Sequence, residues 1–111
     1  MSSYIPNKGD IVVLDFDPQS GHEQQGRRPA FVVSNTLFNK HTGLAIVCPI
    51  TSTQRNIPFH VEIPKGLKIE GFVMVEQVKS VDFMARNAKH IQTSPAPLLN
   101  EVLAILDACI Y

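Results

Sequence analysis

The sequence has little cysteine, no excess of either charge and no long hydrophobic run, and each shortage excludes a class of protein. Cys48 and Cys109 lack the close spacing of zinc and redox motifs, so we expect buried, reduced thiols in a cytoplasmic protein. Ten Lys and Arg residues balance ten Asp and Glu residues, so a polyanion site must be a local cluster. No stretch reaches transmembrane length, and residues 1–8 lack the apolar segment of a signal peptide, so we expect no membrane contact.

Motifs that bind a catalytic metal or a nucleotide are also missing. His22 and Glu23 begin like the zinc-protease motif HExxH, but Gly26 stands where the second histidine is required. The glycines form neither a P-loop nor a dinucleotide-binding pattern, and no nucleophile elbow is present. We therefore expect no metal and no cofactor, which leaves acid/base or electrostatic catalysis.

What is present is the composition of a folded domain. The chain has 111 residues, of which 44% are hydrophobic, enough for a core without disulfides or metal. No repeat or linker is visible, so we expect one domain over residues 1–111. Alternating or dense apolar runs predict strands over 10–16, 30–33, 44–50, 59–63, 71–75 and 89–92, with room for a helical turn within 34–43.

The range 59–63 alternates most regularly. This pattern directs Phe59, Val61 and Ile63 inward and leaves His60 and Glu62 facing outward. Near the end of the chain the hydrophobic period changes from two to that of a helix.

The C-terminal helix is expected to follow Ser94, a suitable N-cap, with Pro95 at the first helical position. Its apolar stripe would pack on the core through Leu99, Val102, Leu103, Leu106 and Ile110. Short strands closed by one helix predict a mainly β fold, a small and strongly bent antiparallel sheet or barrel.

The segment 21–29 concentrates an acid, an imidazole, two amides and two guanidinium groups directly before the apolar run 30–33. Pro29 fixes its own φ and keeps Arg28 out of the helical region, so this cation is held in place. A guanidinium fork matches two phosphate oxygens at once, which suits phosphodiester chemistry. A solvated hairpin loop is the alternative interpretation.

Two further polar clusters follow later strands. Thr51, Ser52 and Thr53 leave the run 44–50 and would donate to phosphate oxygens beside Arg28, or only cap a turn. The polar residues of 76–82 form either a solvated edge or the floor of a binding groove, and the pattern does not decide between them.

Four segments, in this order, resemble the motifs of the MazF/PemK toxins of bacterial toxin–antitoxin modules. They are 8–12, 21–29 with its following strand, 49–51 and 76–82. The resemblance spans nearly the whole chain and implies an SH3-like barrel with a C-terminal helix, acting as a homodimer. It also implies a metal-independent endoribonuclease that cuts single-stranded mRNA at short sequences. A cognate antitoxin would inhibit it by covering the RNA site with an extended acidic segment.

On this resemblance the catalytic arginine falls on Arg28 and the catalytic threonine on Thr51. The implied reaction is a transesterification, in which the ribose 2′-oxygen attacks the adjacent phosphorus and leaves a 2′,3′-cyclic phosphate and a 5′-hydroxyl. Arg28 and Thr51 suit the neutralisation of charge on the non-bridging oxygens, and Arg28 is also a candidate proton donor. Glu23 is the candidate proton acceptor and His22 the alternative.

The remaining candidates are expected to contact RNA. They are His22, Gln24, Arg27, Ser52, Gln77, Lys79 and Arg86. His41, His60 and His90 are expected at the surface without a role in the site. Two other functions stay open: a toxin of the same fold that poisons DNA gyrase by binding protein, and a non-catalytic nucleic-acid-binding barrel.

Overall fold

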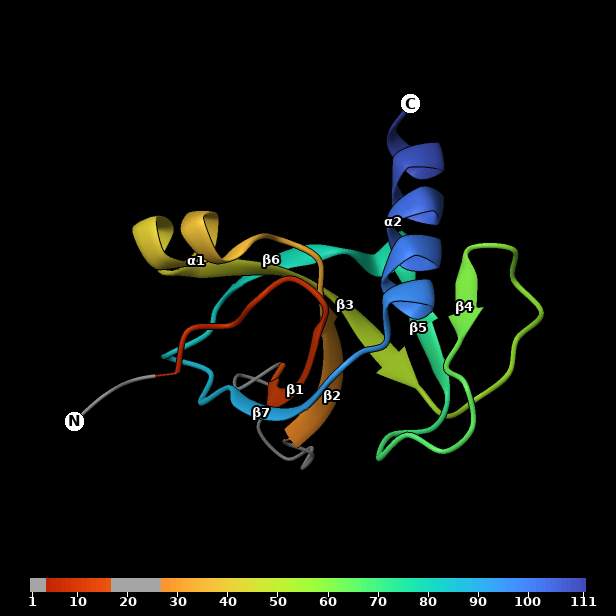
Figure 1. Cartoon of the computed structure of the whole chain (residues 1–111), viewed down its shortest axis with the longest axis horizontal. Coiled ribbons are helices and arrows are strands. Elements are labelled where there is room, and N and C mark those ends of the chain that lie inside the picture. The colour runs from red at the N-terminus through yellow and green to blue at the C-terminus, as the bar shows by residue number, and fades with distance from the viewer. Residues whose placement is uncertain (1–3, 17–26) are drawn as a thin grey trace.

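The computed structural model describes residues 4–16 and 27–111, which form a bent antiparallel sheet with two helices at one end (Figure 1). The elements in chain order are β1 (Asp10–Asp15), β2 (Arg27–Val32), α1 (Thr36–Thr42), β3 (Leu44–Thr51), β4 (His60–Glu62), β5 (Phe72–Met74), the 3-10 turn η2 (Val75–Gln77), β6 (Lys79–Asp82), β7 (Lys89–Thr93) and α2 (Ala96–Ile110). The predicted mainly β fold with a C-terminal helix is confirmed, as is the helical turn, which is α1. The strand β6 was not predicted.

The sheet has the strand order β4-β5-β3-β2-β1-β7, and β6 pairs with β3 outside this path. The first half of β3 pairs with β6 through Leu44 to Val47, while its end pairs with β5 through Ile50 and Thr51. One strand therefore carries the chain from one part of the sheet into the other. Within the described residues the end strands β4 and β7 are not paired with each other, so the predicted barrel is a bent, open sheet.

The central strands bury both of their faces. Ile11 of β1 and Phe31 of β2 join a cluster that α2 covers, whereas their neighbours Val12 and Val32 join a second cluster with Phe83. Because successive side chains of a strand point to opposite faces, a strand covered on both sides needs an unbroken apolar run. This explains the dense runs in β2 and β3.

Helix α2 begins one residue later than predicted. Its N-cap is Pro95, no side chain caps it, and the buried hydroxyl of Ser94 has no hydrogen-bond partner among the described residues. Pro97 lies in the first turn, where its missing N–H costs nothing. The apolar stripe packs on the core as expected near Val102, but Ile110 is 63% exposed because the end of α2 extends beyond the sheet (Figure 1).

Three predictions of burial were wrong. Phe59 is 39% exposed, because β4 begins only at His60 and Phe59 lies in the preceding turn. The side chain of His60 is only 3% exposed, since it turns toward Glu76 of η2. Cys109 is exposed because it lies in the last turn of α2, whereas Cys48 of β3 is buried as expected. Burial raises the pKa of the Cys48 thiol to about 12.

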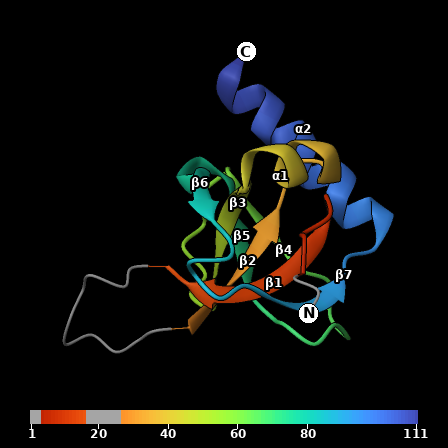
Figure 2. The same ribbon diagram turned by 90° about the vertical axis from the view of Figure 1, so that its left-hand side faces the viewer.

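Both helices lie at one end of the molecule, and β2 begins at the other (Figure 2). Among the described residues no helix combines the length and the apolar character needed to cross a membrane. Arg28 near the start of β2 and Thr51 at the end of β3 lie at the end opposite the helices, whereas η2 packs against α2.

Candidate active site

Arg28 and Thr51 are brought together by the pairing of β2 with β3. Ala30 lies opposite Pro49 and Phe31 opposite Cys48, and Arg28 and Thr51 each lie two residues beyond the Ala30–Pro49 pair. Both residues line the same open cavity. Two residues that are 23 positions apart in the sequence therefore line one cavity.

The cavity, which we name the cationic groove, has a volume of about 650 Å³. Its lining residues are Arg27, Arg28, Pro29, Ile50, Thr51, Ser52, Thr53, Arg55, Lys68, Ile69 and Glu70. Four of these are cations and one is an acid. This balance attracts a polyanion locally, although the whole chain has no net charge.

Hydrogen bonding leaves the Thr51 hydroxyl able to act as a donor. Its Oγ1 accepts a bond of 3.2 Å from the backbone N–H of Thr53. The hydroxyl proton is not used in that bond, so Thr51 can still donate it to a phosphate oxygen. The two interpretations of this cluster, a turn cap and a phosphate donor, are therefore compatible.

Gly71 fixes the backbone of Thr51 from the opposite side. Its φ is +129°, and a Cβ added there would overlap the Thr51 carbonyl oxygen and lie 3.3 Å from the Cα of Ser52. Only glycine adopts this conformation and permits this approach without cost. The residue before β5 is thus packed directly against Thr51, the predicted catalytic threonine.

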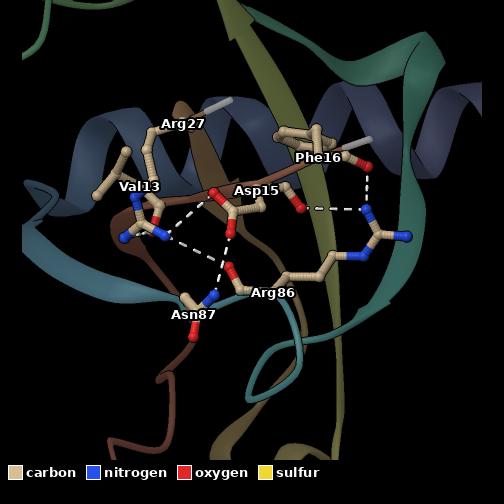
Figure 3. Close-up of polar contacts among 6 residues, drawn as sticks. All are labelled: Val13, Asp15, Phe16, Arg27, Arg86 and Asn87. Carbon is tan, nitrogen blue, oxygen red and sulfur yellow. Dashed lines mark hydrogen bonds and ion pairs between the residues drawn. The ribbon is translucent and has the colours of Figure 1, made fainter. Parts of the chain in front are cut away.

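Arg86 and Arg27 hold together the ends of β1 and β2 (Figure 3). Arg86 donates from Nη1 to the carbonyl oxygen of Asp15 at 3.1 Å and to that of Phe16. Arg27 Nη1 lies 3.3 Å from Asp15 Oδ1, and Asn87 Nδ2 donates to Asp15 Oδ2 at 3.0 Å. The hydrogen bond from Asn87, aided by the bond and charge of Arg27, holds the pKa of Asp15 below its usual range.

The structure thus divides the predicted site residues into three groups. Arg28, Thr51, Ser52 and Arg27 share the cationic groove, although Arg27 also binds Asp15. Gln77, Lys79 and Arg86 do not line it; the Lys79 ammonium lies over the Phe16 ring, 5.3 Å from its centroid. His22, Glu23 and Gln24 lie outside the described residues. The catalytic roles of Arg28, Thr51 and Glu23 stay predictions, as do the RNA contacts of the other candidates.

The sequence analysis missed three charged residues of the groove. Arg55, Lys68 and Glu70 lie in the irregular segments on either side of β4, where no periodicity indicates a direction. Their charge alone was visible in the sequence. Only the folding of these segments against the end of β3 brings them to Thr51.

The buried His60 has a definite partner in the structure. Its Nε2 lies 2.9 Å from Glu76 Oε2, and this contact joins β4 to η2. Its buried Nδ1 has no partner within residues 4–16 and 27–111. Burial tends to raise the pKa of Glu76, but the hydrogen bond and charge of His60 outweigh it and lower that pKa. Glu76 precedes Gln77, so this pair fixes the backbone next to a predicted RNA contact.

Comparison with known proteins decides the family. The family model of the PemK-like, MazF-like toxins of type II toxin–antitoxin systems matches residues 7–110. The chain belongs to this toxin family. It is 40% identical over 88 residues to the endoribonuclease toxin MazF of Escherichia coli (strain K12), covering 79% of this chain and 78% of that protein. It is 40% identical over 111 residues to the endoribonuclease toxin ChpB of the same strain, covering 93% and 92%.

A solved structure of the family agrees with the fold. The crystal structure of MazE-MazF (Form-III) from Deinococcus radiodurans matches with a TM-score of 0.88 and 38% identity, covering 96% of this chain and 97% of that one. The family resemblance proposed from the four sequence motifs is therefore confirmed. The match includes the strands that carry Arg28 and Thr51 in this toxin-family chain.

Proposed function

We propose that the protein is a toxin endoribonuclease that cleaves single-stranded mRNA at short sequences by metal-independent transesterification. The observation that carries the proposal is the meeting of Arg28 and Thr51 in a groove lined by four cations. Membership of a family whose relatives are named endoribonuclease toxins supports it. The same names favour this function over gyrase poisoning and over nucleic-acid binding without catalysis.

Two groove residues, Arg28 and Thr51, each have a chemical task in this reaction. The Arg28 guanidinium neutralises the charge that develops on the non-bridging phosphate oxygens, and the Thr51 hydroxyl donates to one of them. An arginine side chain stays protonated, so another group must accept the proton of the 2′-hydroxyl. We assign that task to Glu23, with His22 as the alternative, on the family resemblance alone.

A cognate antitoxin is the second proposed partner. A crystal structure of the family holds MazE with MazF. An extended acidic segment would pair with the cations of the groove and so compete with RNA for the same surface. The encounter of a toxin with mRNA and antitoxin requires the cytoplasm, which we propose as its location.

A homodimer is the proposed assembly. Leu37 and Phe38 of α1 and Leu44 at the start of β3 are large apolar residues that stay 66%, 37% and 36% exposed. Exposed apolar side chains on adjoining elements favour a protein interface, and a symmetric partner covers them with one self-complementary surface.

The proposed activity is tested by digestion of a long, defined RNA in EDTA, followed by mapping of the cut sites and end groups. We expect cuts in single-stranded regions with cyclic or 3′-phosphate ends and 5′-hydroxyls. A strict requirement for a divalent ion would contradict the mechanism. Intact RNA together with inhibited gyrase would establish the alternative function.

A further inference from the structure

A second cavity, which we name the acidic pocket, adjoins the cationic groove. Its volume is about 290 Å³, and it shares Ser52 and Glu70 with the groove. The lining residues are Ser52, Gln54, Glu62, Ile63, Lys65, Glu70, Gly71 and Phe72. Because the two cavities share a wall, a nucleotide bound at Arg28 and Thr51 has a neighbour within reach of the acidic pocket.

The chemistry of the acidic pocket differs from that of the groove. Its charged residues are two carboxylates, Glu62 and Glu70, and one cation, Lys65, so it repels a phosphate that the groove attracts. Within residues 4–16 and 27–111, neither carboxylate takes part in an ion pair, which leaves both oxygens of each available as acceptors. Phe72, only half-buried, and Ile63 add apolar surface.

These groups suit one class of ligand. An aromatic ring stacks on a nucleobase of any kind, whereas a carboxylate accepts hydrogen bonds only from N–H or O–H groups. Cytosine, adenine and guanine each carry an exocyclic amino group that donates to a carboxylate. Uracil has a carbonyl oxygen in place of the amino group, and its one Watson–Crick donor, N3–H, lies between two carbonyl oxygens that would face the negative charge of Glu62 or Glu70.

We propose that the acidic pocket is a base-specificity pocket, which binds an amino-bearing base next to the cleaved phosphate and rejects uracil. The inference rests on the proposed nuclease function, because that function supplies the RNA strand in the adjoining groove. The structure thereby separates two tasks: the cations hold the backbone, and the carboxylates with Phe72 select the base.

The test measures binding without cleavage. A randomised pool of short 2′-O-methyl RNA, which lacks the attacking hydroxyl, is selected on the full-length protein and sequenced. We expect wild-type protein to exclude uracil at one fixed position. Glu62→Gln, which changes a residue that lines the acidic pocket but not the groove, should reduce this discrimination about tenfold. Phe72→Leu should weaken binding whichever base stands at that position, because stacking is lost.

Matched controls make the result decisive. Glu101→Gln makes the same chemical change on the exposed face of α2 and should leave the base profile unchanged. Circular dichroism melts verify that each variant is folded, and Glu70→Gln repeats the test on the shared wall. Base profiles of Glu62→Gln and Glu70→Gln that are both identical to wild type, or enrichment of uracil by the wild-type protein, would overturn the proposal. Base selection that depends on Glu62 without any cleavage of ordinary RNA would uphold the pocket and refute the nuclease.

Discussion

Gly71 packs so closely against Thr51 that a Cβ on the glycine would overlap the threonine's carbonyl oxygen. Gly71→Ala should therefore displace Thr51 and lower kcat for RNA cleavage, and strain of about 1–3 kcal/mol should lower the free energy of unfolding. Gly66→Ala is the matched control, because its φ is +98° but nothing lies within 4 Å of the added Cβ. Equal activity of the two variants would contradict the assigned contact.

Arg28 should be required as a bidentate cation. Arg28→Ala and Arg28→Lys should each reduce cleavage roughly a hundredfold or more, since lysine keeps the charge but loses the fork. Thr51→Ala should lose rate and keep the fold. Single-turnover rates on a defined RNA measure the effect, with Lys89→Ala on the exposed edge of β7 as control. Cleavage by Arg28→Ala at the wild-type rate would remove Arg28 from the mechanism.

Arg86 should stabilise the fold through hydrogen bonds that another positively charged side chain cannot reproduce. Arg86→Lys breaks bonds to the Asp15 and Phe16 carbonyls and should cost about 1.5–3 kcal/mol in the free energy of unfolding. If Arg86 also contacts RNA, Arg86→Lys should keep most of the RNA affinity, because lysine retains the positive charge that attracts phosphate. Urea unfolding and the salt dependence of RNA binding distinguish the two roles. An unchanged unfolding midpoint would show that the carbonyl bonds are unimportant.

The pair of His60 and Glu76 should make stability depend on pH. The pKa of Glu76 is lower in the folded chain than its usual value of 4.5, so the folded state favours the ionised carboxylate. Its stabilising contribution is present above pH 4.5 and is lost as the pH falls through the folded pKa. Thermal melts from pH 7 to 3 should show Glu76→Gln less stable at neutral pH, with the difference shrinking in acid. A difference independent of pH would refute this linkage.

RNA and antitoxin should compete for one surface of a dimer. Sedimentation at micromolar concentration should give a dimer, and Leu37→Glu should weaken it by placing a charge among exposed apolar residues. RNA affinity should fall as salt rises, because phosphates replace counterions at the groove's cations. A fully active monomer would contradict the dimer, and an antitoxin that inhibits without displacing RNA would contradict the competition.

The sequence by itself determined the local features. Alternation and dense apolar runs predicted most strands, the change of period predicted α2, and the ordered motifs identified Arg28 and Thr51 as a pair. These signals are local or depend on the order of motifs along the chain, so they can be read without knowledge of the three-dimensional structure. Alternation wrongly predicted a buried Phe59, which lies in the turn before β4, because periodicity does not mark where a strand begins.

The tertiary structure decided which distant residues meet. Arg86 binds carbonyl groups some seventy positions earlier, Lys68 reaches the groove, and His60 is buried against Glu76. None of these contacts has a periodic signal, because each joins segments that only the folded chain brings together. The acidic pocket arises in the same way: Glu62 and Glu70 belong to different segments, and only the β4-β5 pairing places them around Phe72.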